Sequence, residues 1–245
     1  ELAMRAPADG HTLLFGSVNA MTAAVALRKA PSYDPARDFT PISMMGRATQ
    51  FIYVHPGVPA KTLGEFIAHA KANPGKLNCG IPNPLSGFQY IQLARATGTD
   101  LLHVPYKGEG PVMPDLLSAR LHSTINSSGT ATVLHKEGKL RALAVLLKNR
   151  SPLLPDVPTV DEAGVPQVTV RHWAGVFGPA KLPGELVTRL NREISTALGR
   201  ADVKEKFLSF GYAIEGSTPE ELAAINRNDL VLWRRLVKEA NVTLD

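Results

Sequence analysis

Short apolar runs alternate with longer stretches of helical periodicity along most of the chain. The runs hold about four to eight residues, as strands do, and most end in a short polar tip before the next helical stretch begins. This alternation predicts an α/β fold with a parallel or mixed sheet and helices on both of its faces. We expect strands over residues 12–15, 42–45, 51–54, 77–80, 101–105, 121–125, 140–147 and 168–177.

Start and stop signals locate the helices. Thr62 and Glu65 form a capping-box pattern, and the Asn-Pro-Gly run at 73–75 ends the helix that follows. Three prolines between residues 152 and 158 remove backbone donors and predict a loop. We expect helices over residues 21–29, 62–71 and 86–97, after residue 110, from about residue 131, and over residues 183–198, 202–210 and 219–240.

The composition is that of a globular protein of one or two domains, with 245 residues, 44% of them hydrophobic and 20% charged. No apolar run approaches the ~20 residues that a membrane span needs. The net charge of +5 attracts anions and raises the question of nucleic acid. Basic residues such as Lys61 and Lys107 are scattered singly, without an aromatic-interleaved stripe. We therefore interpret the charge as a solvated basic surface and expect no nucleic-acid partner.

The linear signatures of catalysis and metal binding are missing. The sequence has no Gly-x-Ser-x-Gly elbow, His-Glu-x-x-His pair or Walker loop, and the Gly-Glu-Gly run at 108–110 predicts only a turn before a helix. The seven histidines include no i, i+4 pair, and the single cysteine, Cys79, is predicted to be a packed thiol. His172, between Arg171 and Trp173, stays a candidate for a functional contact. We expect no catalytic residue, no cofactor and no metal.

Three predicted strand ends deliver small polar groups to the start of the next helix. Free backbone N–H groups at a helix start, together with the helix dipole, bind carboxylates without an arginine. Ordinary N-capping explains each tip taken alone, whereas convergence of all three would make a carboxylate site. The polar residues concerned are Ser17 and Asn19, Ser86 and Gly87, and Asn126 and Ser127.

A series of longer motifs carries a family resemblance. The motifs are DGHTLL at 9–14, YDP at 33–35, DFTPI at 38–42, NPGKLN at 73–78, HVPYKG at 103–108, GKLRALAV at 138–145, RSPLLPDVPTV at 150–160 and WAGVFGP at 173–179. In this order, along essentially the whole chain, they resemble the substrate-binding proteins of tripartite tricarboxylate transporters, also called the Bug family.

The resemblance implies a type II periplasmic-binding-protein fold, with two α/β lobes and a ligand cleft and hinge between them. One lobe would comprise residues 1–48 and 174–245, and the other residues 49–173. Family members are exported to the periplasm, capture small carboxylates through helix N-termini and ordered water, and deliver them to membrane permease subunits. On this analogy the expected ligand-binding residues are the six polar-tip residues together with Asn83 and Trp173.

Two features depart from the family pattern. The chain begins late, without the first strand, glycine-rich loop, first helix and second strand of its relatives, so it is either a piece of a longer protein or a truncation. A truncated lobe would expose a sheet edge. In the tip at 81–89, Ile81, Asn83, Leu85 and Gly87 stand where relatives carry Gly and Ser. The bulk of Ile81 and Leu85 is expected to shrink or dry the pocket, with Ser86 as the main hydroxyl.

Three classes of function follow from these observations. The resemblance favours a non-enzymatic periplasmic receptor that binds a small organic acid for a transporter and does not itself span the membrane. A sensor or adaptor for a membrane signalling protein would use the same fold. An α/β enzyme would need a catalytic constellation built from residues such as Asp115, Ser127 and His172.

Overall fold

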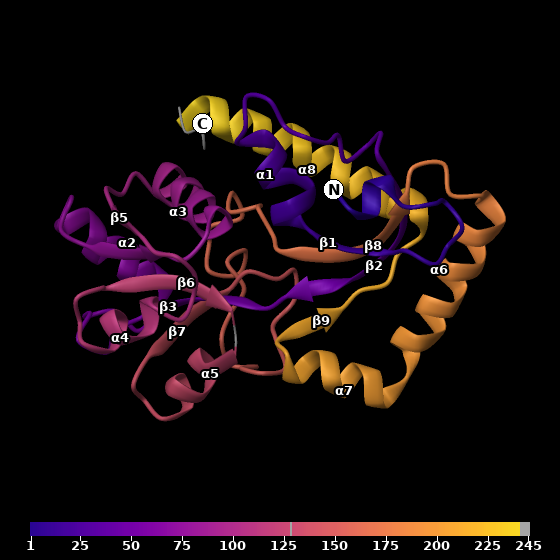
Figure 1. Ribbon diagram of the computed structural model, residues 1–245. Coiled ribbons are helices and arrows are strands. Elements are labelled where there is room, and N and C mark those ends of the chain that lie inside the picture. The colour runs from indigo at the N-terminus through magenta and orange to yellow at the C-terminus, as the bar shows by residue number, and fades with distance from the viewer. Residues whose placement is uncertain (128, 241–245) are drawn as a thin grey trace. The chain divides into compact units, whose positions relative to one another are not determined.

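The computed structural model in Figure 1 describes residues 1–127 and 129–240. The chain forms two compact units. Within the described residues, unit 1 contains Glu1–Arg47, His172–Leu208 and residues 212–240, and unit 2 contains the residues between Ala48 and Arg171 together with Ser209–Gly211. Each unit is built around its own sheet.

Unit 1 has a four-stranded sheet of order β1-β8-β2-β9. Because β8 pairs antiparallel with both β1 and β2, a strand from late in the chain lies between two early ones. The strands are β1 (Leu14–Ser17), β2 (Phe39–Ala48), β8 (Trp173–Pro179) and β9 (Tyr212–Ile214). The helices are η1 (Ala3–Arg5), η2 (Asn19–Ala23), α1 (Ala24–Ala26), α6 (Gly184–Gly199), α7 (Ala201–Ser209) and α8 (Pro219–Ala240).

The helix predicted over 21–29 is shorter and less regular than expected. A π-helical segment, η2, precedes a short α-helical one, α1, which ends at Ala26. The Thr22 hydroxyl donates to the Val18 carbonyl four residues earlier, at 2.5 Å. Such back-bonding competes with the regular helical hydrogen bonds and bends helices. The composition of the segment is helical, but a local side-chain bond changes its geometry.

Unit 2 has a five-stranded sheet of order β5-β4-β6-β3-β7. β4 is parallel to β5 and β6, whereas β3 is antiparallel to β6 and β7. The strands are β3 (Gln50–Val54), β4 (Asn78–Ile81), β5 (Leu102–Pro105), β6 (Ser123–Ser127) and β7 (Arg141–Val145). The helices are α2 (Leu63–Ala72), α3 (Pro84–Thr97), α4 (Val112–Leu117) and α5 (Gly129–Lys136). The predicted mixed α/β sheet is confirmed.

Helices α3 and α4 cover opposite faces of this sheet (Figure 1). Tyr90 of α3 shares a 2.7 Å hydrogen bond with the Ser123 hydroxyl of β6. Ser123 is the register partner of Cys79 in β4, so the next residue, Gly80, faces the other side. A Cβ at Gly80 would lie 3.0 Å from Val112 of α4. Glycine at this position therefore allows α4 to approach the sheet closely.

The start of α2 follows the sequence prediction, and the start of α3 does not. Thr62 is the N-cap of α2 and accepts the Glu65 N–H at 3.1 Å. Helix α3 begins at Pro84 with Asn83 as its N-cap, two residues before the predicted start at Ser86. Asparagine is a strong N-cap, and the fixed φ of proline suits the first helical position, so this pair begins the helix.

The last predicted strand, 168–177, is regular only within β8, because α3 holds the segment before it. Gln92 Oε1 accepts the N–H groups of Thr169 and Val170, both at 3.1 Å. The Gln89 side-chain amide donates to the Val170 carbonyl at 3.1 Å. The side-chain amides of Gln89 and Gln92 thus bond backbone groups of Thr169 and Val170 that would pair with a neighbouring strand in a sheet. The predicted strand therefore began too early, since β8 starts at Trp173.

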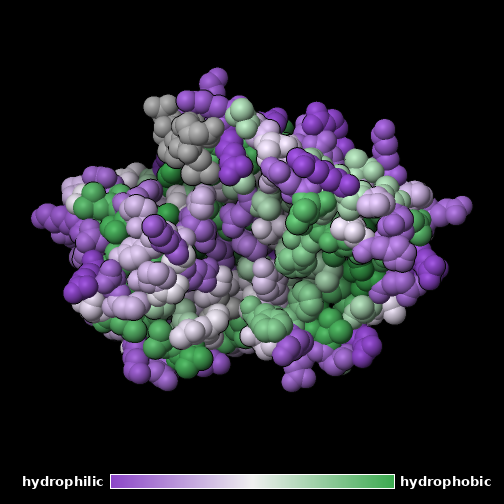
Figure 2. Space-filling model, viewed as in Figure 1, coloured by the Kyte–Doolittle hydropathy of each residue, from purple (hydrophilic) through white to green (hydrophobic). Residues whose placement is uncertain are grey.

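Hydrophilic residues are spread over the face shown in Figure 2, with apolar areas between them. Several arginines pair with an acidic neighbour close in sequence, as Arg37 does with Asp38 and Arg200 with Asp202, both at 2.8 Å. The Arg200–Asp202 pair is exposed on both sides and contributes little to stability, whereas in the Arg37–Asp38 pair only the arginine is well exposed. None of the helices in the described part of the chain combines the length and apolar character that crossing a bilayer requires.

Candidate functional site

The carboxyl ends of β4 and β6 lie side by side at one edge of the unit 2 sheet. The two strands are parallel neighbours, with Cys79 opposite Ser123, and each leads into a helix, α3 or α5. β3 begins at the same edge, where Gln50 pairs with Ser127. In α/β sheets ligands bind beyond the carboxyl ends of strands, beside helix starts. This edge carries five of the predicted site residues, namely Asn83, Ser86, Gly87, Asn126 and Ser127.

The start of α3 is closed by a reciprocal capping box. Asn83 Oδ1 accepts the Ser86 N–H at 3.0 Å, while Ser86 Oγ accepts the Asn83 N–H at 3.4 Å and donates to the Asn83 carbonyl at 2.8 Å. Ser86 is fully buried, and Pro84 has no N–H to offer. Gly87 packs against Ile81, whose methyl would lie 3.2 Å from an added Cβ. Of the two interpretations left open by the sequence, N-capping describes this tip.

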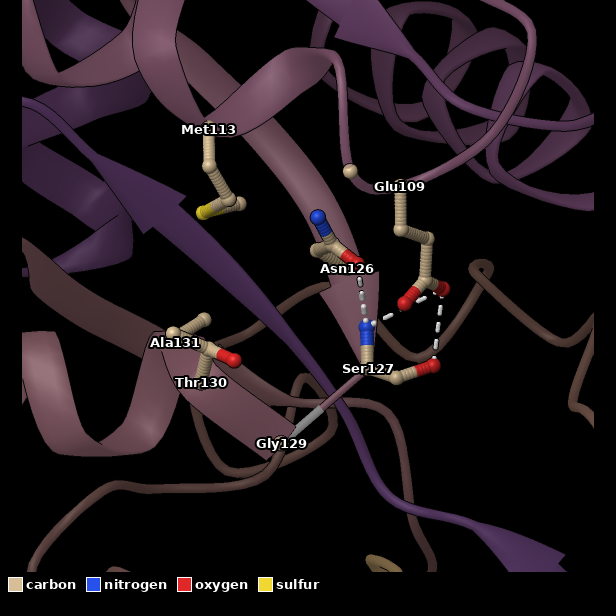
Figure 3. Close-up of a pocket in the computed structure, with 8 residues that line it drawn as sticks. Glu109, Met113, Asn126, Ser127, Gly129, Thr130 and Ala131 are labelled. Carbon is tan, nitrogen blue, oxygen red and sulfur yellow. Dashed lines mark hydrogen bonds between the residues drawn. The ribbon is translucent and has the colours of Figure 1, made fainter.

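The end of β6 binds a carboxylate that comes from another loop. Ser127 donates its N–H at 3.3 Å and its hydroxyl at 2.8 Å to Glu109 Oε1 (Figure 3). The Ser127 N–H also points to the Oδ1 of Asn126, at 2.8 Å. Both Asn126 and Ser127 are strand residues rather than the tip residues predicted, because their pairing with β3 extends β6. Glu109 lies in the loop between β5 and α4.

A small pocket of about 110 Å³ adjoins this group. Its walls include Glu109, Met113 of α4, Asn126 of β6, and Gly129 and Thr130 at the start of α5 (Figure 3). The first turn of a helix has N–H groups without intrahelical partners, and the helix dipole is positive there. One wall is therefore an electropositive helix start and another is a carboxylate. The pocket can receive both an anionic group and a hydrogen-bond donor.

The charge of Glu109 also acts on Tyr53 of β3. Tyr53 is fully buried, and its hydroxyl shares a 3.3 Å hydrogen bond with Thr132 of α5. Burial raises the pKa of Tyr53 far above its usual value, and the nearby Glu109 charge raises this pKa further. The Tyr53 hydroxyl is thus neutral at physiological pH and joins the start of α5 to the sheet.

Glu109 was not predicted as a site residue. The Gly-Glu-Gly run at 108–110 predicted only a turn, and the chain does bend there. Gly108 has a φ of +115°, a conformation that favours glycine over residues with a Cβ. The loop can therefore present the Glu109 side chain to Ser127. The signal available in the sequence is a charged residue between two glycines, shortly after a strand of the sheet.

Unit 1 holds the other three predicted residues. Ser17 ends β1, where it pairs with Ala174, and Asn19 is the first residue of η2. The buried Asn19 Oδ1 has no hydrogen-bond partner among the described residues. Trp173 is fully buried, and its indole N–H donates to Asp229 Oδ2 at 2.6 Å. The indole N–H of Trp173 is therefore already bonded within unit 1.

Two other residues noted in the sequence, His172 and Cys79, have side chains that are neutral at physiological pH. Burial lowers the pKa of His172 to about 4, and the ring packs edge-on against Tyr212 with centroids 5.9 Å apart. Cys79 is fully buried beside Ser123, and burial raises the pKa of its thiol to about 12, which confirms its predicted packing role. Across residues 1–127 and 129–240, no three His, Cys, Asp or Glu side chains gather as a metal site would require.

Known proteins resemble this chain over nearly its whole length. The model of the family described as "Tripartite tricarboxylate transporter family receptor" matches residues 1–242. Protein BugT of Bordetella pertussis is 31% identical over 245 residues, covering 98% of this chain and 74% of BugT. The structure of R. palustris Rpa4515 with adipate has 29% identity and a TM-score of 0.84, covering 99% of this chain and 82% of that one. The structure of MatC (Rpa3494) from Rhodopseudomonas palustris with bound malate has 29% identity and a TM-score of 0.77, covering 96% of this chain and 82% of that one.

These similarities confirm two of the predictions. Two of the similar structures are described as a periplasmic transporter and as the periplasmic binding protein BugD, and this chain has their two-lobed α/β fold of type II. The matched family and structures are solute-binding proteins rather than enzymes, so the chain is a binding protein and not an enzyme. We therefore interpret the sheet edge of unit 2 as a candidate binding site rather than a catalytic site.

Proposed function

Because this chain belongs to the tripartite tricarboxylate transporter receptor family, as its motifs predicted, we propose that it is a periplasmic receptor for a small organic carboxylate. The receptor captures the acid outside the cytoplasm and delivers it to the membrane permease subunits of the transporter. Similar structures with adipate and with malate support this ligand class. The net charge of +5 favours capture of an anion.

The start of α5 in unit 2 carries this proposal. Gly129 and Thr130 form one wall of the 110 Å³ pocket. The unpaired N–H groups of a helix start, with a dipole equivalent to about half a positive charge, bind carboxylates. The pocket is smaller than the roughly 300–1,000 Å³ of sites that enclose a whole ligand. We therefore assign it one carboxylate end of the acid.

The predicted site residues take different roles in this proposal. Asn126 and Ser127 line the pocket, whereas Asn83 and Ser86 are not among its lining residues and fix the start of α3. Ser17 and Asn19 of unit 1 stay predicted ligand-binding residues.

A thermal-shift screen of the full chain against mono-, di- and tricarboxylates tests the proposal. An acid at about 100 times its dissociation constant stabilises the native state by ~2.7 kcal/mol, which raises Tm measurably. Gly129→Asp places a carboxylate at the start of α5, where an added Cβ meets no atom within 4 Å. The fold should tolerate this change, since an acidic residue suits a helix start. The ligand carboxylate should be repelled, so we expect the variant to lose the shift.

Gly184→Asp is the matched control, because Gly184 is the first residue of α6 and its Cβ would also meet nothing within 4 Å. This control should keep the wild-type shift. If no acid raises the Tm of the wild-type chain, the receptor proposal is wrong. If Gly129→Asp responds like the wild type, the receptor stands and the pocket is misassigned. Uptake of a binding acid by vesicles that carry the permease subunits, measured with and without this chain, tests delivery.

A further inference from the structure

We infer that Glu109 makes this receptor select acids that carry a hydrogen-bond donor close to the carboxylate, with an ammonium group preferred over a hydroxyl. This inference rests on the proposed function and narrows its ligand class. It follows from the position of Glu109 in the wall of the pocket (Figure 3). A bound acid therefore brings its carboxylate into a pocket that already contains the carboxylate of Glu109.

One oxygen of the Glu109 carboxylate is occupied and the other is available. Oε1 accepts both bonds from Ser127, one from the N–H and one from the hydroxyl. Oε2 has no hydrogen-bond partner in the part of the chain that the structure describes. In Figure 3 the side chain extends from its loop toward Ser127 at the end of β6. A donor on a bound ligand can therefore reach Oε2 while the bonds to Ser127 stay intact.

The charge of Glu109 has no protein counterion among the described residues. None of the ion pairs formed by residues 1–127 and 129–240 includes Glu109. Its hydrogen-bond donors come from Ser127, which is neutral, and the pocket walls around it are Asn126, Met113 and Thr130, which are neutral as well. A half-buried carboxylate in such a setting attracts a cation and repels an anion.

The two charged walls of the pocket match an acid with a neighbouring amine. The start of α5 receives the ligand carboxylate, and Glu109 receives the ammonium group. An acid without a donor leaves Oε2 unpaired and places two carboxylates close together, which costs affinity. A hydroxyl group on the ligand can donate a hydrogen bond to Oε2 but does not neutralise the charge of the Glu109 carboxylate. We expect the amino acid to bind about 10- to 100-fold more tightly than the plain acid, the range that one charge-assisted hydrogen bond contributes.

The same contacts are also compatible with a purely structural Glu109, which would only hold its loop against β6. Glu109→Gln separates the two roles. The glutamine carbonyl can still accept both bonds from Ser127, so the loop would still be held against β6. The charge that selects an ammonium group would be lost. Fold and selectivity are therefore expected to respond differently to this single change.

Isothermal titration of the full chain with matched acids tests the inference. Two sets are used, succinate with malate and aspartate, and propionate with lactate and alanine, so that each skeleton carries no donor, a hydroxyl or an ammonium group. For the wild type we expect affinity to rise in that order within the set that binds. Glu109→Gln should lower the preference for the amino acid over the plain acid at least tenfold and leave Tm near the wild-type value.

Glu137→Gln is the control, because the Glu137 side chain makes an exposed ion pair with Lys139 at 2.8 Å and lies outside the pocket. Its selectivity should equal that of the wild type. If the plain and amino acids bind equally and Glu109→Gln changes nothing, the inference is overturned and the carboxylate receptor stands. If no member of either set binds and no carboxylate shifts Tm, the proposed function fails and the inference fails with it.

Discussion

Gln92 holds an irregular segment of unit 2 against α3, and its removal has a predictable energetic effect. Its Oε1 accepts the N–H groups of Thr169 and Val170, and its Nε2 donates to the Thr169 hydroxyl at 3.0 Å. Gln92→Ala leaves the N–H of Val170, a residue only 3% exposed, without an acceptor. Each lost bond contributes about 0.5–1.5 kcal/mol, and an unsatisfied buried donor costs about 1–3 kcal/mol. We expect the free energy of unfolding to fall by about 2–4 kcal/mol.

Urea unfolding followed by far-UV circular dichroism measures this loss as a lower midpoint. Gln167→Ala serves as the control, because Gln167 is exposed and lies in the same segment. Its effect should stay within about 0.5 kcal/mol of the wild type. If Gln92→Ala and Gln167→Ala unfold at the same urea concentration, the side-chain bonds do not hold the segment and the reasoning is refuted.

Two further substitutions test a helix start and the core of unit 1. Asn83→Ala removes the acceptor of the Ser86 N–H and should lower the free energy of unfolding by about 1 kcal/mol. Asn83→Asp retains an acceptor oxygen and should leave the free energy of unfolding unchanged. Equal urea midpoints for the two variants would show that the cap does not stabilise the helix start. Burial raises the pKa of Asp229, so its contribution to stability is greatest at low pH and falls as pH rises above the unfolded value of about 4. Asp229→Asn, which keeps an oxygen for Trp173, should therefore gain stability relative to the wild type between about pH 4 and about pH 7. A difference in urea midpoint that stays constant over this range would contradict that sign.

The sequence predicted those elements whose signals lie within a few neighbouring residues. Residues 51–54 are apolar and were assigned to a strand, and all four are fully buried in β3. Thr62 was identified as a cap from its spacing to Glu65, and it accepts the expected bond. The Asn-Pro-Gly run at 73–75 ends α2 directly after Ala72. Local propensity and capping are sufficient at such positions, because the interactions that decide the structure are local.

The errors occur where a residue distant in sequence supplies the decisive hydrogen bond. The strand predicted from residue 168 is interrupted by Gln92, 78 positions before Val170. The strand predicted to end at 125 continues through Ser127, because the ladder with β3 extends it. Glu109 was overlooked for the same reason, since its partner lies 18 positions away. Apolar periodicity contains no information about such pairs, which are fixed only when the sheet has formed.

The two helix starts at the edge of the unit 2 sheet differ in what they leave for a ligand. At α3, Asn83 and Ser86 bind each other, so the helix start is satisfied by the chain itself. At α5, the helix start shares a pocket with the carboxylate of Glu109, which reaches Ser127 from a loop outside the strands. A loop residue can be replaced without changing the register of β4 and β6. Ligand preference in this protein is therefore expected to depend on Glu109, whereas the strands determine where the pocket forms.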